Sequence, residues 1–390
     1  MRTLLLANIF YWACAGVFTP FLSSYFTRQG LDASQIGIVF TMVPLCSIFV
    51  QPLWSAFADR IGGRKIVLVC LCLAAAAVAP LFNFSSTFIA ALLATLAFSA
   101  FFQALLPVCD SLVIEAAARG GLEFSRIRMG GTIGYAVVVV VAGYALEAWP
   151  SVQFVMVPVI LLVFAMRCAR LPQPWKEARP GVRPSETRKT RGHGFRSIFT
   201  TDEIVIVLSF VFVSSVGLGF HGSFLGRYCI ELGNGQDLVG ILSAVSAMSE
   251  IPILIVSDRL ICHIGEVHLL LFSCFAMALR LLLVSTGIVP VMIAAQLLQS
   301  VSYMTVYYSA VTYIAKHTLP GAQARGQSVL VMVQAGFATV IANLIGGFLC
   351  DAFGTGVSFV IFAGITTAGT FVVIALMGVH RKKALARTSR

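Results

Sequence analysis

The chain has 390 residues, of which 58% are apolar and only 11% are Asp, Glu, Lys or Arg, with a net charge of +11. Charged residues make up about 25% of a typical soluble domain, so this composition excludes a soluble enzyme, a nucleic-acid-binding protein and a disordered scaffold. It predicts a polytopic membrane protein, and at roughly 30 residues for each span and its loop the length predicts about twelve spans.

Twelve apolar runs follow one another along the chain, and each is predicted to be a helix because backbone polar groups in lipid must be hydrogen-bonded within their own segment. The runs cover 4–26, 36–57, 65–83, 87–117, 129–148, 150–168, 202–230, 237–257, 267–286, 288–315, 327–349 and 356–379. The expected fold class is an all-α membrane protein with twelve transmembrane helices in two pseudo-symmetric six-helix bundles. The expected boundaries are 1–168 for the first bundle, 169–200 for a linker, 201–380 for the second bundle and 381–390 for a tail.

The only long break between runs separates the sixth from the seventh. Residues 170–200 contain four prolines and eight basic residues against two acidic ones, a composition typical of a solvated linker. Two six-helix halves joined by a basic loop are the layout of transporters built from repeats. An Asp-Arg pair recurs after spans 2 and 8, as Asp59-Arg60 and Asp258-Arg259, which favours duplication of an ancestral half.

Basic residues gather in every second loop, as the positive-inside rule expects for cytoplasmic segments. This pattern predicts that both termini lie in the cytoplasm. The protein is expected to span the plasma membrane, which in a bacterium is the inner membrane. The candidate outside loops hold only Arg28 and Arg227. The ten cysteines lie mostly in apolar runs without metal-ligand spacing, so they are interpreted as packing residues and no cofactor is expected.

The loop after the second span carries a motif with a physical rationale. It reads Ser55-Ala-Phe-Ala-Asp59-Arg60-Ile-Gly62-Gly-Arg64-Lys65, in which the acid could cap the next helix and bind the facing basic residues. This segment resembles the loop 2–3 signature of the major facilitator superfamily, except that Ser55 replaces the first glycine. The resemblance implies that Asp59, Arg60, Gly62, Arg64 and Lys65 form a cytoplasmic gate.

Within that superfamily the first half resembles the oligosaccharide:proton symporters, the lactose permease branch. Gln35-Ile-Gly-Ile-Val-Phe looks like the second span of that branch, and Arg126-Ile-Arg128-Met-Gly-Gly-Thr132-Ile-Gly-Tyr135 like the opening of its fifth. The second stretch also resembles the phenylpropionate permease and nucleoside symporter branches. The motifs therefore indicate the superfamily but do not distinguish between its branches.

Charged residues inside spans are functional candidates, because a charge at the bilayer centre costs at least a few kcal/mol. Asp110 falls near the midplane in span 4, and Arg128 opens the antiparallel span 5, so the two are expected to form a charge pair. Tyr135 lies two turns further along the same face. The resemblance implies that the pair binds sugar hydroxyls and that Tyr135 stacks on the sugar ring; a tie between spans is the structural alternative.

The second half offers a separate set of candidates. The resemblance assigns Glu250 in span 8 to the branch's other essential acid and Arg280 in span 9 to a branch arginine. His221 is a deep histidine, and an imidazole titrates near pH 6.5 when unperturbed, which suits proton exchange; a hydrogen-bonded packing residue is the structural alternative. Gln296, Gln299, Tyr303 and Tyr307 recur at helical spacing and predict one polar-aromatic face of span 10.

The second half also departs from the branch. Its span 10 histidine and glutamate align with Gln299 and Ser302, which cannot titrate, and its span 11 lysine aligns with Gly336. The proton site of lactose permease is therefore not reproduced. Glu115 and Asn343 receive no role.

The expected function is that of a secondary active transporter, not an enzyme, that takes up a small polar solute such as a sugar or nucleoside by proton-coupled symport and alternating access. The candidate substrate-binding residues are Asp110, Arg128, Tyr135, Glu250, Gln299 and Tyr303, and the candidate proton-coupling residues are Glu250, Asp110, His221 and Arg280. The alternatives are uptake of an aromatic carboxylate and proton-driven efflux, although no proline interrupts the glycine-rich fifth span as an antiporter signature would. The expected partners are the solute, protons and the lipid bilayer, with no nucleic acid, and the functional unit is expected to be a monomer.

Overall fold

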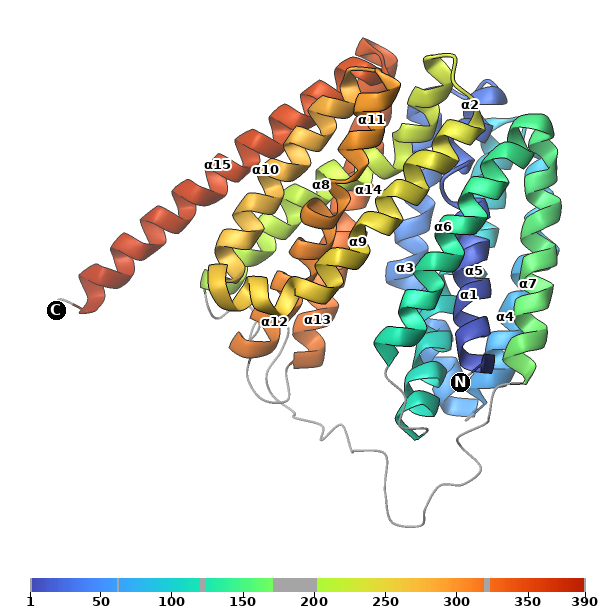
Figure 1. Ribbon diagram of the computed structural model, residues 1–390, viewed down its shortest axis with the longest axis horizontal. Helices are drawn as coiled ribbons and strands as arrows, with labels where there is room; N and C mark the ends of the chain where they lie inside the picture. The colour runs from blue at the N-terminus through green and yellow to red at the C-terminus, as the bar shows by residue number, and fades with distance from the viewer. Residues whose placement is uncertain (1, 62, 120–123, 171–201, 319–322, 389–390) are drawn as a thin grey trace. The chain divides into compact units, whose positions relative to one another are not determined.

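The computed structural model describes residues 2–61, 63–119, 124–170, 202–318 and 323–388. Every regular element within these ranges is a helix, as Figure 1 shows. The all-α prediction is therefore confirmed for this part of the chain. Most of the predicted linker lies outside the described residues.

In the first half, the described residues form seven α-helices and two short 3₁₀ segments. They are α1 (Arg2–Phe18), α2 (Leu22–Arg28), α3 (Ala33–Ile61), α4 (Arg64–Val78), η1 (Ala79–Phe84), α5 (Phe88–Arg119), α6 (Phe124–Ala148), η2 (Pro150–Val152) and α7 (Gln153–Ala169). The first predicted span is divided between α1 and α2, because Pro20 has no N–H to continue the helical ladder.

The described residues of the second half are also helical and include two π-helical turns inside its spans. Its elements are α8 (Asp202–Glu231), α9 (Gln236–Ile264), α10 (Glu266–Ser285), α11 (Val289–Gln296), η5 (Ser300–Met304), α12 (Thr305–His317), α13 (Gln323–Val331), η6 (Met332–Phe337), α14 (Ala338–Phe353) and α15 (Thr355–Thr388). The π turns η5 and η6 interrupt the predicted tenth and eleventh spans. Such turns often mark functional positions in helices.

Among the described residues, eleven helical segments are long and apolar enough to cross a membrane, so the protein is a multi-pass membrane protein. The predicted eighth span corresponds to α9, which has 29 residues but is not one of the eleven. Its described part carries Asp237 and Glu250, which lower its hydropathy, and four of its side chains lie outside the described set. Both α3 and α9 run past the predicted ends of their spans, so the recurring Asp-Arg pairs belong to helices rather than to loops.

The chain divides into two compact units that do not coincide with the two halves of the sequence. Unit 1 comprises 1–184 together with 223–248 and 343–352, and unit 2 comprises 185–222, 249–342 and 353–390. In unit 1, α1 packs along α6 and α7, and α3 packs along α5. In unit 2, α10 packs along α15 and α12.

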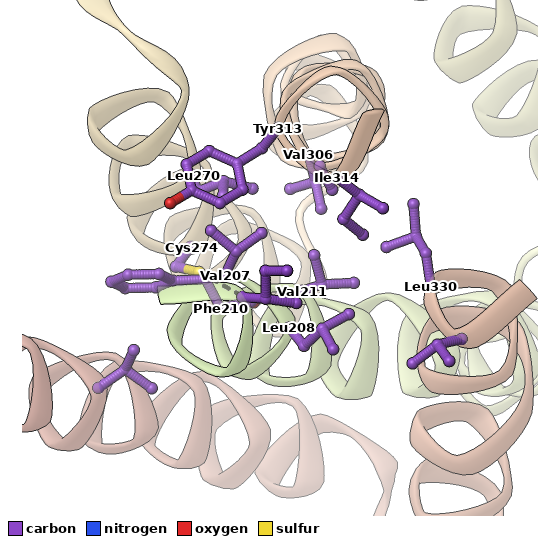
Figure 2. Packing of buried hydrophobic residues seen from close by; sticks show 14 residues of the cluster. Val207, Leu208, Phe210, Val211, Leu270, Cys274, Val306, Tyr313, Ile314 and Leu330 are labelled. Carbon is purple, nitrogen blue, oxygen red and sulfur yellow. Dashed lines mark hydrogen bonds between the residues drawn. The ribbon is translucent and has the colours of Figure 1, made fainter. Parts of the chain in front are cut away.

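The core of unit 2 is an apolar cluster at the start of α8. Figure 2 shows four α8 side chains facing residues of α10, α12 and α13. The four are Val207, Leu208, Phe210 and Val211, and none is more than 6% exposed. Helices in a membrane associate through close packing of their side chains, so this cluster fixes the start of α8 against its neighbours.

Unit 1 includes parts of α8, α9 and α14 because a set of hydrogen bonds attaches them to the first half of the chain. Asp351 of α14 accepts hydrogen bonds from the backbone N–H groups of Ala33 and Ser34, both at 2.8 Å. These groups open α3, where the unpaired amides and the helix dipole favour a negative charge. The carboxylate therefore caps a helix that lies more than 300 residues earlier in the sequence.

A second carboxylate makes a similar attachment at α9. Glu147 accepts a hydrogen bond from the backbone N–H of Gln236 at 2.7 Å and pairs with Arg28 at 2.7 Å. Nearby, Gly143 and Gly240 let the backbones of α6 and α9 touch: a Cβ on Gly240 would lie 2.6 Å from the carbonyl oxygen of Val139. Small residues permit this kind of close helix crossing in membranes.

Candidate functional site

Asp110 and Arg128 lie together in unit 1, on α5 and α6. Arg128 Nη1 is 3.8 Å from Asp110 Oδ2, which is an ion pair but is longer than a charge-assisted hydrogen bond. The Arg128 side chain is 40% exposed and that of Asp110 is 21% exposed. Asp110 Oδ1 is buried and has no hydrogen-bond partner among the described residues. The pair is thus loose, and its carboxylate retains the capacity to accept a hydrogen bond.

Two aromatic residues accompany this ion pair. The guanidinium carbon of Arg128 lies 5.4 Å from the ring centre of Trp12 on α1, within the range of a cation–π contact. Trp12 meets Tyr135 edge to face with ring centres 6.4 Å apart. The structure therefore places the predicted Tyr135 beside the ion pair through Trp12.

Asn8 and Trp12, one helical turn apart on α1, were not identified from the sequence. Gly131 of α6 lies against both, because a Cβ at Gly131 would collide with Asn8 Oδ1 and with the Trp12 ring. An intramembrane Asn four residues before a Trp was the available signal. It is weak, because a single neutral polar residue in a span is common and a contact with α6 is not visible in one helix.

The second group of candidates lies in unit 2. Arg280 is 1% exposed and donates to Gln296 Oε1 at 2.6 Å and to Gln299 Oε1. Gln299 in turn donates through Nε2 to Glu250 Oε1 at 3.1 Å. The acid and the arginine, which were predicted without a defined contact, are therefore linked through a neutral amide. We call Glu250, Gln299, Arg280 and Gln296 the amide-bridged cluster.

The remaining candidates of unit 2 are a histidine on α8 and two tyrosines on η5 and α12. His221 on α8 is 5% exposed, and its Nε2 has no hydrogen-bond partner among the described residues. Tyr303 and Tyr307 stack on each other with ring centres 6.5 Å apart. The π turn η5 begins directly after Gln299, so the predicted polar-aromatic face is not one continuous α-helical stripe.

The motif after the second span forms a compact charged cluster in unit 1. Arg64 binds Asp59 at 2.7 Å and lies 3.8 Å from Glu115, which gives Glu115 a place that the sequence did not assign. The expectation that Asp59 caps the next helix is wrong: α4 has Gly63 at its N-cap and no side-chain cap, because Asp59 lies inside α3 and faces Arg64.

The motif also borders a small cavity, and its remaining residues differ in exposure. Asp59 and Arg64 help to line a small cavity of about 100 Å³. Arg60 is exposed, Lys65 is half-buried, and Gly62 lies outside the described residues.

Asn343, also unassigned from the sequence, accepts a hydrogen bond from Ser223 at 2.6 Å within unit 1. Both residues are buried, and Asn343 also faces Gly37, whose absent side chain leaves room for the Asn343 carbonyl oxygen. Its position indicates a structural role in attaching α14 to α8 and α3. Among the described residues, no group of His, Cys, Asp or Glu could hold a metal ion.

Comparison with known proteins identifies a family and several transporters that this chain is similar to. The sequence matches the MFS_1 like family over residues 2–361. It is 24% identical to the maltose permease of Geobacillus stearothermophilus over 365 residues, which cover 93% of this chain and 90% of that protein. It is 23% identical to a probable 3-phenylpropionic acid transporter of Escherichia coli (strain K12) over 371 residues, covering 92% and 93%. The crystal structure of the nucleoside transporter NupG superimposes with a TM-score of 0.80 at 17% identity, covering 96% of this chain and 98% of that one.

Proposed function

Because the chain belongs to the MFS_1 like family, a family of the major facilitator superfamily, we propose that it takes up a small polyhydroxylated solute by proton-coupled symport and alternating access. The observation that carries the proposal is the loose Asp110–Arg128 pair beside Trp12, inside membrane-spanning helices. Charged groups are retained at such depth only where they have a partner or a function.

The chemistry of the pair supports a neutral polyol as the solute. Asp110 can accept hydrogen bonds from hydroxyl groups and Arg128 can donate them, while the aromatic rings offer apolar surface to a sugar ring. A maltose permease and a nucleoside transporter are among the proteins that this chain is similar to, and both names denote solutes that carry a sugar ring. We therefore assign sugars or nucleosides as the substrate class.

The amide-bridged cluster supports a role in coupling. Glu250 is the acid of this cluster, and Gln299 connects it to the buried charge of Arg280. Protonation of Glu250 would remove the negative charge opposite Arg280 and change which hydrogen bonds Gln299 makes. Transport coupled to this event would bind one proton in each cycle. His221 is a second proton-accepting candidate in the same unit.

The proposed location rests on the charge distribution along the chain. Basic residues in alternate loops support a topology with both termini on the cytoplasmic side of a bacterial inner membrane. The chain carries charged clusters in both units, so a monomer holds every residue that the proposal uses.

The test is solute uptake into proteoliposomes. With an inward proton gradient, the purified protein should accumulate radiolabelled maltose or uridine, and a protonophore should abolish the accumulation. Asp110→Asn should abolish uptake. Uptake that ignores the proton gradient would overturn proton coupling, and failure to transport any sugar or nucleoside would overturn the substrate class.

A carboxylate substrate is the second candidate, and the similarity to a probable 3-phenylpropionic acid transporter is the observation that favours it. Such a substrate would pair with Arg128 and be repelled by an ionised Asp110. It therefore predicts that Asp110→Asn keeps or improves uptake of 3-phenylpropionate. The polyol proposal predicts that this mutation abolishes uptake, so one variant separates the two.

A further inference from the structure

Asn8 is buried in unit 1 with its hydrogen-bonding capacity unused. Its side chain is 0% exposed, and neither Oδ1 nor Nδ2 has a hydrogen-bond partner among the described residues. A primary amide offers two donors and an acceptor, and leaving them unpaired in a buried position costs stability. A leucine of similar size would avoid this cost.

The unused capacity of Asn8 is shared with its neighbours. Trp12 Nε1 and Asp110 Oδ1 are also buried without a partner. Gly131 touches both Asn8 and Trp12, Trp12 lies against Arg128, and Arg128 pairs with Asp110. These contacts connect Asn8, Trp12, Arg128 and Asp110 into one continuous group, which we call the α1 polar patch.

Two other buried amides and a half-buried indole among the described residues of unit 1 have hydrogen-bond partners. Asn343 accepts from Ser223 at 2.6 Å, Gln153 donates to the carbonyl oxygens of Val17 and Phe18 at 3.1 and 3.2 Å, and Trp54 Nε1 donates to a carbonyl oxygen at 2.9 Å. Apart from Thr95 Oγ1, the buried unpartnered side-chain atoms among the described residues of unit 1 all belong to the α1 polar patch. The unsatisfied groups are therefore concentrated at one place.

We propose that Asn8 and Trp12 bind the transported solute directly, through two adjacent hydroxyl groups of a sugar ring. This inference rests on the proposed function and adds two residues of α1 to it. The patch presents donors on Asn8 Nδ2 and Trp12 Nε1 and acceptors on Asn8 Oδ1 and Asp110 Oδ1. Two neighbouring hydroxyls, each donating one hydrogen bond and accepting another, match this set.

The same set of atoms disfavours a carboxylate ligand. An ionised carboxylate accepts hydrogen bonds but has no hydrogen to donate. It would leave both Asn8 Oδ1 and Asp110 Oδ1 unpaired. The adjacent hydroxyls can belong to a free sugar or to the ribose of a nucleoside, and binding assays distinguish these two sources.

The first test is the thermal stability of the purified protein without solute. Asn8→Leu removes unpaired polar atoms and should raise the Tm by about 2–4 °C. The matched variant Asn343→Leu removes a bonded amide and should lower it. A fall in Tm for Asn8→Leu as large as that for Asn343→Leu would show that Asn8 has a structural partner and would overturn the inference.

The second test follows the indole of Trp12 directly. A protein in which Trp54, Trp149 and Trp175 are replaced by Phe reports on Trp12 alone, and its emission should shift to longer wavelength with maltose or uridine as Nε1 gains a hydrogen bond. A protein that retains only Trp54, whose Nε1 is already bonded, is the matched control and should not shift.

The two solutes identify the source of the hydroxyls. A shift with maltose assigns a free sugar. A shift with uridine that 2′,3′-dideoxyuridine fails to produce assigns ribose. Equal responses to uridine and to its dideoxy analogue would overturn the role of adjacent hydroxyls.

Transport kinetics separate failure of this inference from failure of the proposed function. Asn8→Leu and Trp12→Phe should each raise the KM for the transported solute about tenfold, with expression unchanged. A wild-type protein that transports maltose or uridine, with an Asn8→Leu KM within twofold of its own, overturns only this inference. A wild-type protein that transports neither overturns the proposed function, and the Tm comparison then still decides whether Asn8 is unsatisfied.

Discussion

Arg128 in unit 1 and Arg280 in unit 2 each lie near an acid inside the membrane-spanning helices, but the protein holds them differently. Arg128 is 40% exposed and stands 3.8 Å from Asp110, next to buried polar atoms that have no partner. Arg280 is 1% exposed, and two glutamine oxygens accept its hydrogen bonds. Arg128 is therefore held in a loose ion pair beside unpaired polar atoms, whereas the terminal nitrogens of Arg280 are bonded to two glutamine side chains.

Two charged groups can therefore have separate tasks in one protein. Unsatisfied donors and acceptors gain free energy when a polar ligand arrives, so they suit recognition. A bonded network with one titratable acid responds instead to a change of charge, because a single proton alters several hydrogen bonds. The comparison leads to four predictions, which concern recognition in unit 1 and coupling in unit 2.

Replacing Glu250 should have the largest effect, and it should impair proton coupling without impairing solute binding. Glu250→Gln should reduce proton-driven accumulation roughly 100-fold while leaving exchange of labelled for unlabelled solute intact, because the amide still binds but cannot exchange a proton. Asp110→Asn should abolish both activities. The measurement is paired accumulation and counterflow in proteoliposomes, with Glu231→Gln as the matched control that keeps both. Loss of counterflow in Glu250→Gln would show that Glu250 is needed for solute binding as well as for proton coupling.

The second prediction concerns stability. Arg280→Leu removes a buried positive charge and leaves the side-chain oxygens of Gln296 and Gln299 without their donor, so we expect a loss of about 3–5 kcal/mol. Arg128→Leu should cost less than Arg280→Leu, because Arg128 is 40% exposed and its pair with Asp110 is longer than a hydrogen bond. Thermal unfolding of the two purified variants checks this difference, and equal losses would contradict the description of the Arg128 pair as loose.

The third prediction tests the amide bridge itself. Gln299→Leu removes the hydrogen bonds to Arg280 and Glu250 and should lower the initial rate of proton-driven uptake about tenfold, the equivalent of one lost hydrogen bond to a charged group. Gln103→Leu on α5, whose wild-type side chain accepts a hydrogen bond from Ser47 at 3.3 Å, is the control and should transport normally. A normal rate in Gln299→Leu would mean that the acid and the arginine act independently.

The smallest effect is expected at Arg128. Arg128→Lys keeps the positive charge but loses the planar fork of donors and the large face that lies over Trp12. The KM should rise about threefold to tenfold, while kcat changes little. Initial uptake rates over a range of solute concentrations provide both constants, and a KM equal to that of the wild type would show that charge alone is sufficient.

The sequence was sufficient to predict the helical fold and the proximity of Asp110 and Arg128. Scarce charges stand out against apolar spans, and the short connection between spans 4 and 5 restricts where their residues can meet. Asn8 and Trp12 were missed for the opposite reason. A neutral amide and an indole are unremarkable in an apolar run, and their significance depends on unpaired atoms that only the packed structure reveals.

The contacts of Glu250 could not be predicted either. Its link to Arg280 passes through Gln299, at a position where a π turn changes the register of the helix. A helical wheel places Gln299 on a polar face, but it does not specify which residues of α9 and α10 that face meets. The boundary of the compact units was also beyond reach, because backbone hydrogen bonds from Ala33, Ser34 and Gln236 join segments that are distant in the sequence.

The hydrogen bonds from backbone N–H groups to Asp351 and Glu147 affect how the protein can evolve. Asp351 and Glu147 bind backbone N–H groups, which every amino acid except proline provides. A substitution at a donor position therefore keeps the N–H that makes the attachment, unless the new residue is proline. The connection between the halves of the chain therefore tolerates substitution at the backbone donors but is lost when either carboxylate is replaced.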